Sequence, residues 1–271
     1  MHPIGIFDSG YGGLTVFKKI AERLPQYDYI YLGDNARNPY GPRSFQTVYE
    51  YTLECVQHLF DKGCRLVILA CNTASAKALR NIQQLDLPKY GDNRRVLGVI
   101  RPTAEVVGNY SKTRKVGVLA THGTVISESY LLEIEHLFAD IQVFQQACPM
   151  WVPLVENNEH RDAGADYFVR KNLQQLFSQA ADIDTVILGC THYPLLVPKI
   201  KPFLPPNVKL LEQGDIVADS LADYLVRHPE IEKTCAKNGQ ITFFSTETPE
   251  NFDEKASLFF AQKVNSTQLH L

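Results

Sequence analysis

The sequence has no large excess of charge of either sign and no long apolar run. Its 271 residues include 27 Lys and Arg and 30 Asp and Glu, which gives a formal net charge of −3. This balance gives no indication of binding to nucleic acid or to an anionic membrane surface, which basic proteins favour. The longest apolar runs, such as Leu66 to Cys71, fall well short of the ~18 residues that a transmembrane helix needs. We therefore expect neither a nucleic-acid partner nor a membrane span.

Cysteine pairs, nucleotide motifs and targeting signals are also sparse. The six cysteines are too few for a disulfide scaffold, and no Cys-x-x-Cys spacing indicates a zinc ribbon or a thioredoxin-like site. The glycines at positions 10, 12 and 13 fall short of a dinucleotide fingerprint because Thr15 stands where a third glycine is needed, and no P-loop is present. The start, MHPIGIFDSG, lacks the basic and then apolar stretches of a signal peptide, so a cytoplasmic location with reduced thiols is expected.

Short apolar runs alternate along the chain with segments of helical period. The expected strands are 4–7, 29–32, 66–70, 96–100, 115–120, 185–188, 208–211 and 241–244. The expected helices are 14–24, 47–62, 74–85, 127–138, 166–180 and 216–226. Most strands are continuously apolar, as in strands that helices cover on both faces. The pattern predicts an α/β protein with mainly parallel sheets.

Two pairs of segments are similar to each other. Segment 115–124 is similar to segment 3–12, which places Thr121 opposite Ser9, 112 residues later. Segment 185–192 is similar to segment 66–73, which places Cys190 opposite Cys71, 119 residues later. Apolar strands match by chance, but two pairs in the same order, with polar ends that also match, favour two related α/β halves.

Polar residues follow the ends of several predicted strands, where open parallel sheets bind ligands. Cys71 and Cys190 each end a strand directly before a helix, and the positive end of the helix dipole favours a thiolate there. If the two halves face each other, the thiols approach a ligand from opposite sides. Inversion of a carbon by proton transfer requires such an acid and base on opposite faces.

Asp8 and His192 are the candidates for assisting the two thiols. Asp8 ends the first predicted strand, and His192 lies two residues after Cys190. A metal site on Cys190 and His192 would need further ligands at suitable spacing, and the sequence offers none, so no metal is expected. The other cysteines are interpreted as buried apolar side chains: Cys55, Cys64, Cys148 and Cys235.

These segments carry a resemblance to a known family. The matching stretches are Ile4-Gly-Ile-Phe-Asp-Ser-Gly-Tyr-Gly-Gly-Leu-Thr-Val, Gly33-Asp-Asn-Ala-Arg-Asn-Pro-Tyr-Gly, Ala70-Cys-Asn-Thr-Ala-Ser-Ala, Gly98-Val-Ile, Gly117-Val-Leu-Ala-Thr-His-Gly-Thr, Cys148-Pro-Met-Trp-Val-Pro-Leu-Val-Glu and Leu188-Gly-Cys-Thr-His-Tyr-Pro-Leu-Leu. Through them the sequence closely resembles the glutamate racemases of the cofactor-independent Asp/Glu racemase superfamily. The resemblance extends across most of the chain.

The resemblance implies two α/β domains related by pseudo-twofold symmetry, with the active site in the cleft between them. Residues 1–97 would form the N-terminal domain, completed by 208–271, and residues 98–207 would form the second domain. The activity implied is interconversion of L- and D-glutamate without a cofactor. The D-glutamate would supply peptidoglycan synthesis in bacteria, and a homodimer is one assembly compatible with the resemblance.

Residue roles also follow from the resemblance. Cys71 would act on D-glutamate with the help of Asp8. Cys190 would act on L-glutamate with the help of His192, which has Glu156 behind it. The implied substrate contacts are Asp8, Ser9, Tyr40, Gly41, Asn72, Thr73, Thr121, Thr124, Thr191 and His192.

One departure and several alternatives remain. Arg101-Pro102-Thr103 stands where related proteins often have a Pro-Gly-Ala run, which bears on the hinge or on binding of an activating ligand. The nearest alternative is an aspartate racemase, which a comparison of aspartate with glutamate turnover distinguishes. An arylmalonate decarboxylase-like enzyme needs only one thiol, and an amino-acid sensor needs neither. A thiol-redox protein would have to form a Cys71–Cys190 disulfide.

Overall fold

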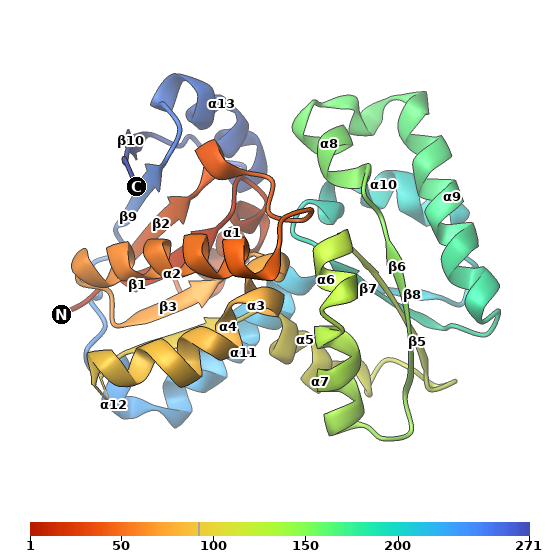
Figure 1. The fold of residues 1–271 in the computed structure, drawn as a ribbon, viewed down its shortest axis with the longest axis horizontal. Coiled ribbons are helices and arrows are strands. Elements are labelled where there is room, and N and C mark those ends of the chain that lie inside the picture. Colours follow the sequence, from red (N-terminus) through yellow and green to blue (C-terminus); the bar gives the residue numbers. More distant parts are fainter. Residues whose placement is uncertain (92) are drawn as a thin grey trace.

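The computed structural model describes residues 1–91 and 93–271, which form two halves, each built on its own sheet (Figure 1). The first sheet has the strand order β10-β9-β2-β1-β3-β4, and the second has the order β6-β5-β7-β8. All paired strands run parallel. The α/β class with mainly parallel sheets is therefore confirmed.

The strands agree closely with those expected from the sequence. They are β1 Ile4–Asp8, β2 Tyr29–Gly33, β3 Leu66–Leu69, β4 Arg95–Gly98, β5 Lys115–Ala120, β6 Gln142–Ala147, β7 Thr185–Gly189, β8 Lys209–Leu211, β9 Ile241–Ser245 and β10 Ser266–Gln268. The prediction missed β6 and β10. Both are edge strands with many polar residues, so neither shows a continuous apolar run.

The helices cover the sheets and fill the connections between strands. They are α1 Gly13–Arg23, α2 Phe45–Asp61, α3 Asn72–Lys77, α4 Leu79–Asn81, α5 Ile100–Val107, α6 His122–Ile126, α7 Ser129–Leu137, α8 Trp151–Glu156, α9 Ala163–Gln179, α10 Val197–Ile200, α11 Gln213–Arg227, α12 Pro229–Glu232 and α13 Pro249–Phe260. Shorter turns of 3-10 helix include Asn35–Arg37 and Tyr193–Leu196, and Ile82–Asp86 is π-helical. Among the described residues, no helix has the length and apolar character needed to cross a membrane.

Two helices that the periodicity predicts differ from the observed ones, one by division and one by a later start. Segment 74–85 is divided between α3, α4 and the π-helical turn, because the backbone departs from helical geometry at Ala78. Segment 127–138 begins only at Ser129, since Glu128 before it has a positive φ of 55°. Helical period in the side chains therefore located these segments but not the breaks in the backbone.

The internal similarity of the sequence corresponds to a repeated topology. Strands β2-β1-β3-β4 of the first sheet have the same order and direction as β6-β5-β7-β8 of the second. The repeat equates β1 with β5 and β3 with β7, as the two similar segment pairs predict. Cys71 and Cys190 therefore follow equivalent strands.

The connections between the halves modify the expected domain limits. The expected boundary at 208 assigns residues 209–211 to the first domain, whereas β8 pairs with β7 in the second sheet. The chain then returns through α11, which packs on α1, with Arg23 Nε 2.8 Å from Asp219 Oδ1. We propose that the second domain runs from the end of β4 to the end of β8, and that the C-terminal segment completes the first domain through β9 and β10 (Figure 1).

Candidate active site

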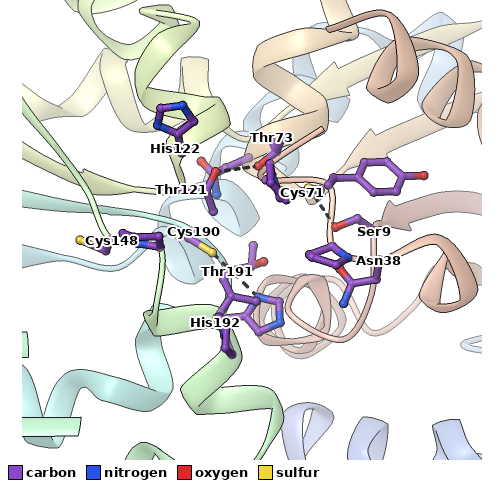
Figure 2. Close-up of a pocket in the computed structure, with 18 of the residues that line it drawn as sticks. Ser9, Asn38, Cys71, Thr73, Thr121, His122, Cys148, Cys190, Thr191 and His192 are labelled. Carbon is purple, nitrogen blue, oxygen red and sulfur yellow. Dashed lines mark hydrogen bonds between the residues drawn. The ribbon is translucent and has the colours of Figure 1, made fainter. Parts of the chain in front are cut away.

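A cavity of about 220 Å³ lies where the carboxyl ends of the two sheets face each other. Parallel pairing places Asp8 level with Gly33, so the polar residues after β1 and β2 emerge at one edge. Residues from both halves line the cavity: Ser9, Asn38, Pro39, Tyr40, Gly41, Pro42, Cys71, Asn72, Thr73, Thr121, His122, Cys148, Pro149, Val152, Pro153, Glu156, Cys190, Thr191 and His192 (Figure 2). The structure thus brings together most of the residues that the sequence singled out, Asp8 and Thr124 being outside this lining.

Cys71 enters the cavity from the first half, directly after β3. Its side chain is 6% exposed and accepts a hydrogen bond from the N–H of Ala74 in the first turn of α3, at 3.4 Å. Its Sγ also lies 3.3 Å from Ser9 Oγ. Burial and the nearby Asp8 carboxylate raise the pKa of Cys71 to about 12. The N–H of Ala74 at the helix start lowers this pKa, as expected, but burial outweighs it, so the expected preference for a thiolate is not met at Cys71.

Cys190 enters from the second half, at the equivalent position after β7 (Figure 2). It is also 6% exposed, and its Sγ lies 3.9 Å from Nδ1 of His192. On the other side of the ring, Nε2 of His192 lies 2.9 Å from Oε1 of Glu156. Cys190, His192 and Glu156 thus form a continuous relay along the wall of the cavity.

The relay is arranged to hold a proton on His192. Burial lowers the pKa of His192, but the contacts with Cys190 and Glu156 outweigh it and raise that pKa to about 10. Burial likewise raises the pKa of Glu156, whereas the hydrogen bonds from His192 and Asn38 lower it, with a net decrease. At neutral pH the pair is therefore an imidazolium and a carboxylate. Such a cation beside a sulfur can stabilise negative charge on it or return a proton to it.

Asp8 lies behind the cavity and is only 1% exposed. Burial raises the pKa of its carboxyl, opposed by the charge of His192 and by backbone N–H groups such as that of Gly10, which donates to Oδ2 at 2.9 Å. Its negative charge in turn raises the pKa of Cys71. Asp8 is therefore close enough to interact electrostatically with a thiol and with the histidine.

The glycines after β1 provide the space for these side chains. A Cβ on Gly13 would lie 2.7 Å from Cγ of Asp8, and a Cβ on Gly12 would lie 2.7 Å from Cε1 of His192. Real Cβ atoms almost never approach other atoms so closely. The glycines that resembled a partial dinucleotide fingerprint thus serve the close approach of Asp8 and His192.

Hydroxyl groups from both halves meet in the cavity. Thr73 Oγ1 lies 2.9 Å from Thr121 Oγ1 and 3.4 Å from Thr124 Oγ1. Thr191, at the other thiol, accepts a hydrogen bond through its backbone oxygen from Thr15, at 2.9 Å. Within the described residues no lysine or arginine lines the cavity. Apart from the imidazolium of His192, an anion bound here would be held by neutral hydroxyl and N–H donors.

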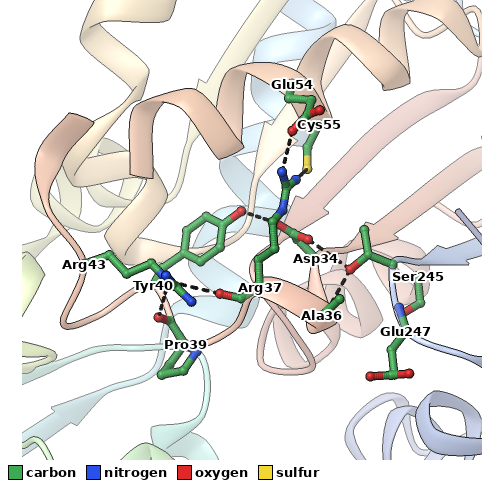
Figure 3. A network of polar contacts seen from close by, with 11 residues as sticks. Asp34, Ala36, Arg37, Pro39, Tyr40, Arg43, Glu54, Cys55, Ser245 and Glu247 are labelled. Carbon is green, nitrogen blue, oxygen red and sulfur yellow. Dashed lines mark hydrogen bonds and ion pairs between the residues drawn. The ribbon is translucent and has the colours of Figure 1, made fainter. Parts of the chain in front are cut away.

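Two residues predicted to contact the substrate, Tyr40 and Asn72, already use their side-chain polar groups in hydrogen bonds within the protein. The Tyr40 hydroxyl donates to the buried Asp34, in a network that includes Arg37 (Figure 3). The Asn72 amide donates to Gln213 at 2.6 Å, and its oxygen accepts from Tyr130 at 2.7 Å. Both residues line the cavity, but their side-chain hydrogen bonds stabilise the surrounding protein structure.

Sequence reasoning missed part of the lining. Asn38, His122 and Cys148 reach the cavity, as do Val152 and the prolines at 39, 42, 149 and 153. Asn38 and His122 follow predicted strands, so strand-end position was the available signal. Cys148 follows β6, which the sequence did not reveal, and is buried as expected, as are Cys55, Cys64 and Cys235.

Comparisons with known proteins cover nearly the whole chain. A model of the Asp/Glu/Hydantoin racemase family matches residues 4–221. A glutamate racemase from Roseobacter denitrificans is 40% identical over 271 residues, covering 96% of this chain and 97% of that protein. The crystal structure of a glutamate racemase isoform from Bacillus anthracis has a TM-score of 0.88 and 34% identity, covering 100% and 98% of the two chains. That of the Francisella tularensis glutamate racemase in complex with D-glutamate has a TM-score of 0.88 and 30% identity, covering 99% and 97%.

Proposed function

This chain belongs to the Asp/Glu/Hydantoin racemase family, and from that premise we propose that it interconverts L- and D-glutamate through two thiols. One observation carries the mechanism: Cys71 and Cys190 follow equivalent strands of the two sheets and line the same cavity (Figure 2). The substrate assignment rests on the glutamate racemases that match nearly the full chain.

The reaction moves one proton off the α-carbon and another onto its opposite face. With L-glutamate, the Cys190 thiolate takes the α-proton and the Cys71 thiol donates its own, which yields D-glutamate and a Cys71 thiolate. With D-glutamate the two thiols exchange roles. The high pKa of Cys71, about 12, keeps its thiol protonated before L-glutamate binds, as its role as the proton donor requires. His192, held by Glu156, supports the charge changes on Cys190.

The cavity also supports the formation of a carbanion. Charge that develops when the α-proton leaves moves onto the α-carboxylate, where fixed donors stabilise it best in a water-poor site. Ser9, Thr73, Thr121 and Thr191 provide such donors from both halves. Closing of the two halves over the substrate would exclude water at the moment of proton transfer. The D-glutamate formed would supply peptidoglycan synthesis in the cytoplasm.

The test is incubation of the purified protein with L-glutamate in D2O without added cofactor, followed by circular dichroism and proton NMR. We expect loss of optical activity, and at early times deuterium at Cα of the D-glutamate formed but not of the remaining L-glutamate. That asymmetry arises because the donating thiol exchanges with solvent, whereas the α-proton removed is held by the other thiol.

Single-thiol variants complete the test. Cys71→Ser and Cys190→Ser should each lower kcat/KM by at least about 10²-fold. Because the enantiomers have equal free energies, each variant must lower kcat/KM equally in both directions. Cys235→Ser, which changes a buried thiol outside the cavity lining, is the matched control. Binding of glutamate without exchange at Cα would contradict the proposal, and faster turnover of aspartate would reassign the substrate.

A further inference from the structure

Asn38 is carried by the first half but forms a hydrogen bond with the relay of the second half. Its Nδ2 donates to Oε1 of Glu156 at 2.8 Å, and the same oxygen lies 2.9 Å from Nε2 of His192. Glu156 is the last residue of α8, on the far side of the cleft from the loop that carries Asn38. One carboxylate oxygen therefore interacts with a donor from each half of the molecule.

From this geometry we propose that Asn38 is a positioning residue, which holds the Glu156 carboxylate against His192 and so supports the relay behind Cys190 only when the two halves are closed. The inference rests on the proposed function, in which Cys190 exchanges the α-proton. It assigns Asn38 an effect through Glu156 and His192, with no contact to the reacting atoms.

The loop that carries Asn38 is held in place by contacts within the first half, independently of Glu156. The buried Asp34 carboxylate accepts hydrogen bonds from Arg37 Nε at 2.7 Å and from Thr246 Oγ1 at 2.9 Å, besides that from Tyr40 (Figure 3). The Asn38 amide also packs on Gly10, where an added Cβ would lie 3.3 Å from its Cγ. The amide therefore meets Glu156 from a fixed position, and little entropy is lost in forming the bond.

Several titratable groups on other elements interact with His192 and Glu156. Asp8 from β1 and Cys190 face His192, while Lys255 from α13 and Tyr11 act on Glu156. The hydrogen bond from Asn38 is one of the contacts that lower the pKa of Glu156. Without it the carboxylate is less stable as an anion and less well oriented, so it supports the imidazolium of His192 less.

Separation of the two halves would break the Asn38–Glu156 bond but leave the Glu156–His192 bond, since both of its residues belong to the second half. The Glu156 carboxylate then keeps both of its donors only in the closed arrangement. This is how an enzyme can link full acid–base strength to closure over its substrate.

The first experiment uses Asn38→Leu, which removes the donor at similar side-chain volume, with Asn38→Ala as a second variant in case leucine disturbs folding. We expect kcat/KM to fall about tenfold, because a hydrogen bond to a charged group is lost. The alkaline limb of the pH profile should move to lower pH. Asn157→Leu is the matched control, since Asn157 is exposed beside Glu156 and its Nδ2 donates to the Pro153 backbone oxygen, at 2.8 Å.

A double-mutant cycle separates action through Glu156 from direct contact with the substrate. In a Glu156→Ala background, Asn38→Leu should change kcat/KM by less than about twofold, since the partner is already absent. A full tenfold loss in that background, or a loss of less than twofold in the native background, would overturn the inference.

The titration of His192, followed by NMR of histidine-labelled protein without substrate, keeps the inference separate from the proposed function. Its pKa should be lower in Asn38→Leu than in the native protein, with His192→Asn identifying the resonance. A lowered pKa in a protein that does not racemise glutamate would refute only the proposed function. An unchanged pKa in an active racemase would refute only the role of Asn38.

Discussion

Replacement of Gly12 by alanine tests whether the cavity depends on the space beside His192. The backbone of Gly12 has φ −58° and ψ −39°, which alanine adopts without strain. The obstacle is the added Cβ, which would lie 2.7 Å from Cε1 of His192 and closer still to Nδ1 and to Thr191 Oγ1. Both neighbours are buried, and Glu156 holds the ring from its other side, so neither can move freely.

The magnitudes distinguish an effect on activity from an effect on stability. Overpacking costs about 1–3 kcal/mol, whereas alanine in a helical conformation gains about 0.5–1 kcal/mol over glycine. The net loss of unfolding free energy should therefore stay at or below about 2.5 kcal/mol. A shift of His192 by about 1 Å can cost about 10²-fold in rate. We expect Gly12→Ala to fold and to lose about 10²-fold in kcat/KM for glutamate.

The assay pairs racemisation followed by circular dichroism with thermal unfolding, and Gly164→Ala is the control. Gly164 lies in the first turn of α9, and an added Cβ would meet no atom within 4 Å. That variant should be slightly more stable than the native protein and equally active. The reasoning is refuted if Gly12→Ala keeps more than a third of the native kcat/KM while folded.

Two further predictions concern stability. Tyr40→Phe removes a donor from the buried Asp34 carboxylate, so the unfolding free energy measured in urea should fall by about 1–3 kcal/mol; an unchanged midpoint would mean that the other donors suffice. The pKa of His192 rises from 6.5 to about 10 on folding, so its contribution to stability is complete below pH 6.5 and lost as the pH rises through 10. His192→Asn should therefore lose less stability than the native protein between pH 7 and 10, and equal losses would contradict this sign.

Much of the fold was predictable because local chemistry decides it. Buried parallel strands such as β3 and β7 must be continuously apolar, so each is visible as a run of Val, Ile and Leu. The edge strands β6 and β10 lack that signal, because fewer of their side chains are buried. The helical period of apolar residues also gives no indication of the changes in backbone conformation at Ala78 and Glu128, because it depends only on which face is buried.

The part of the candidate site that follows directly after predicted strands could be located from the sequence. Cys71, Cys190 and His192 could be located from their places after apolar runs, and Glu156 only through the family resemblance. Asn38 follows a predicted strand too, but nothing local indicates that its amide meets a carboxylate 118 residues away.

The sequence by itself determined the two related halves, the positions of both thiols and the edge of each sheet where chemistry could occur, because apolar periodicity and strand-end residues are local properties. Only the tertiary structure decided the protonation of Cys71 and of His192. Burial keeps Cys71 a thiol against the influence of its helix, and Glu156 keeps His192 charged against its own burial. Desolvation and charge pairing depend on which distant segments come together, as Glu156 and His192 do, and they are set only after the chain has folded.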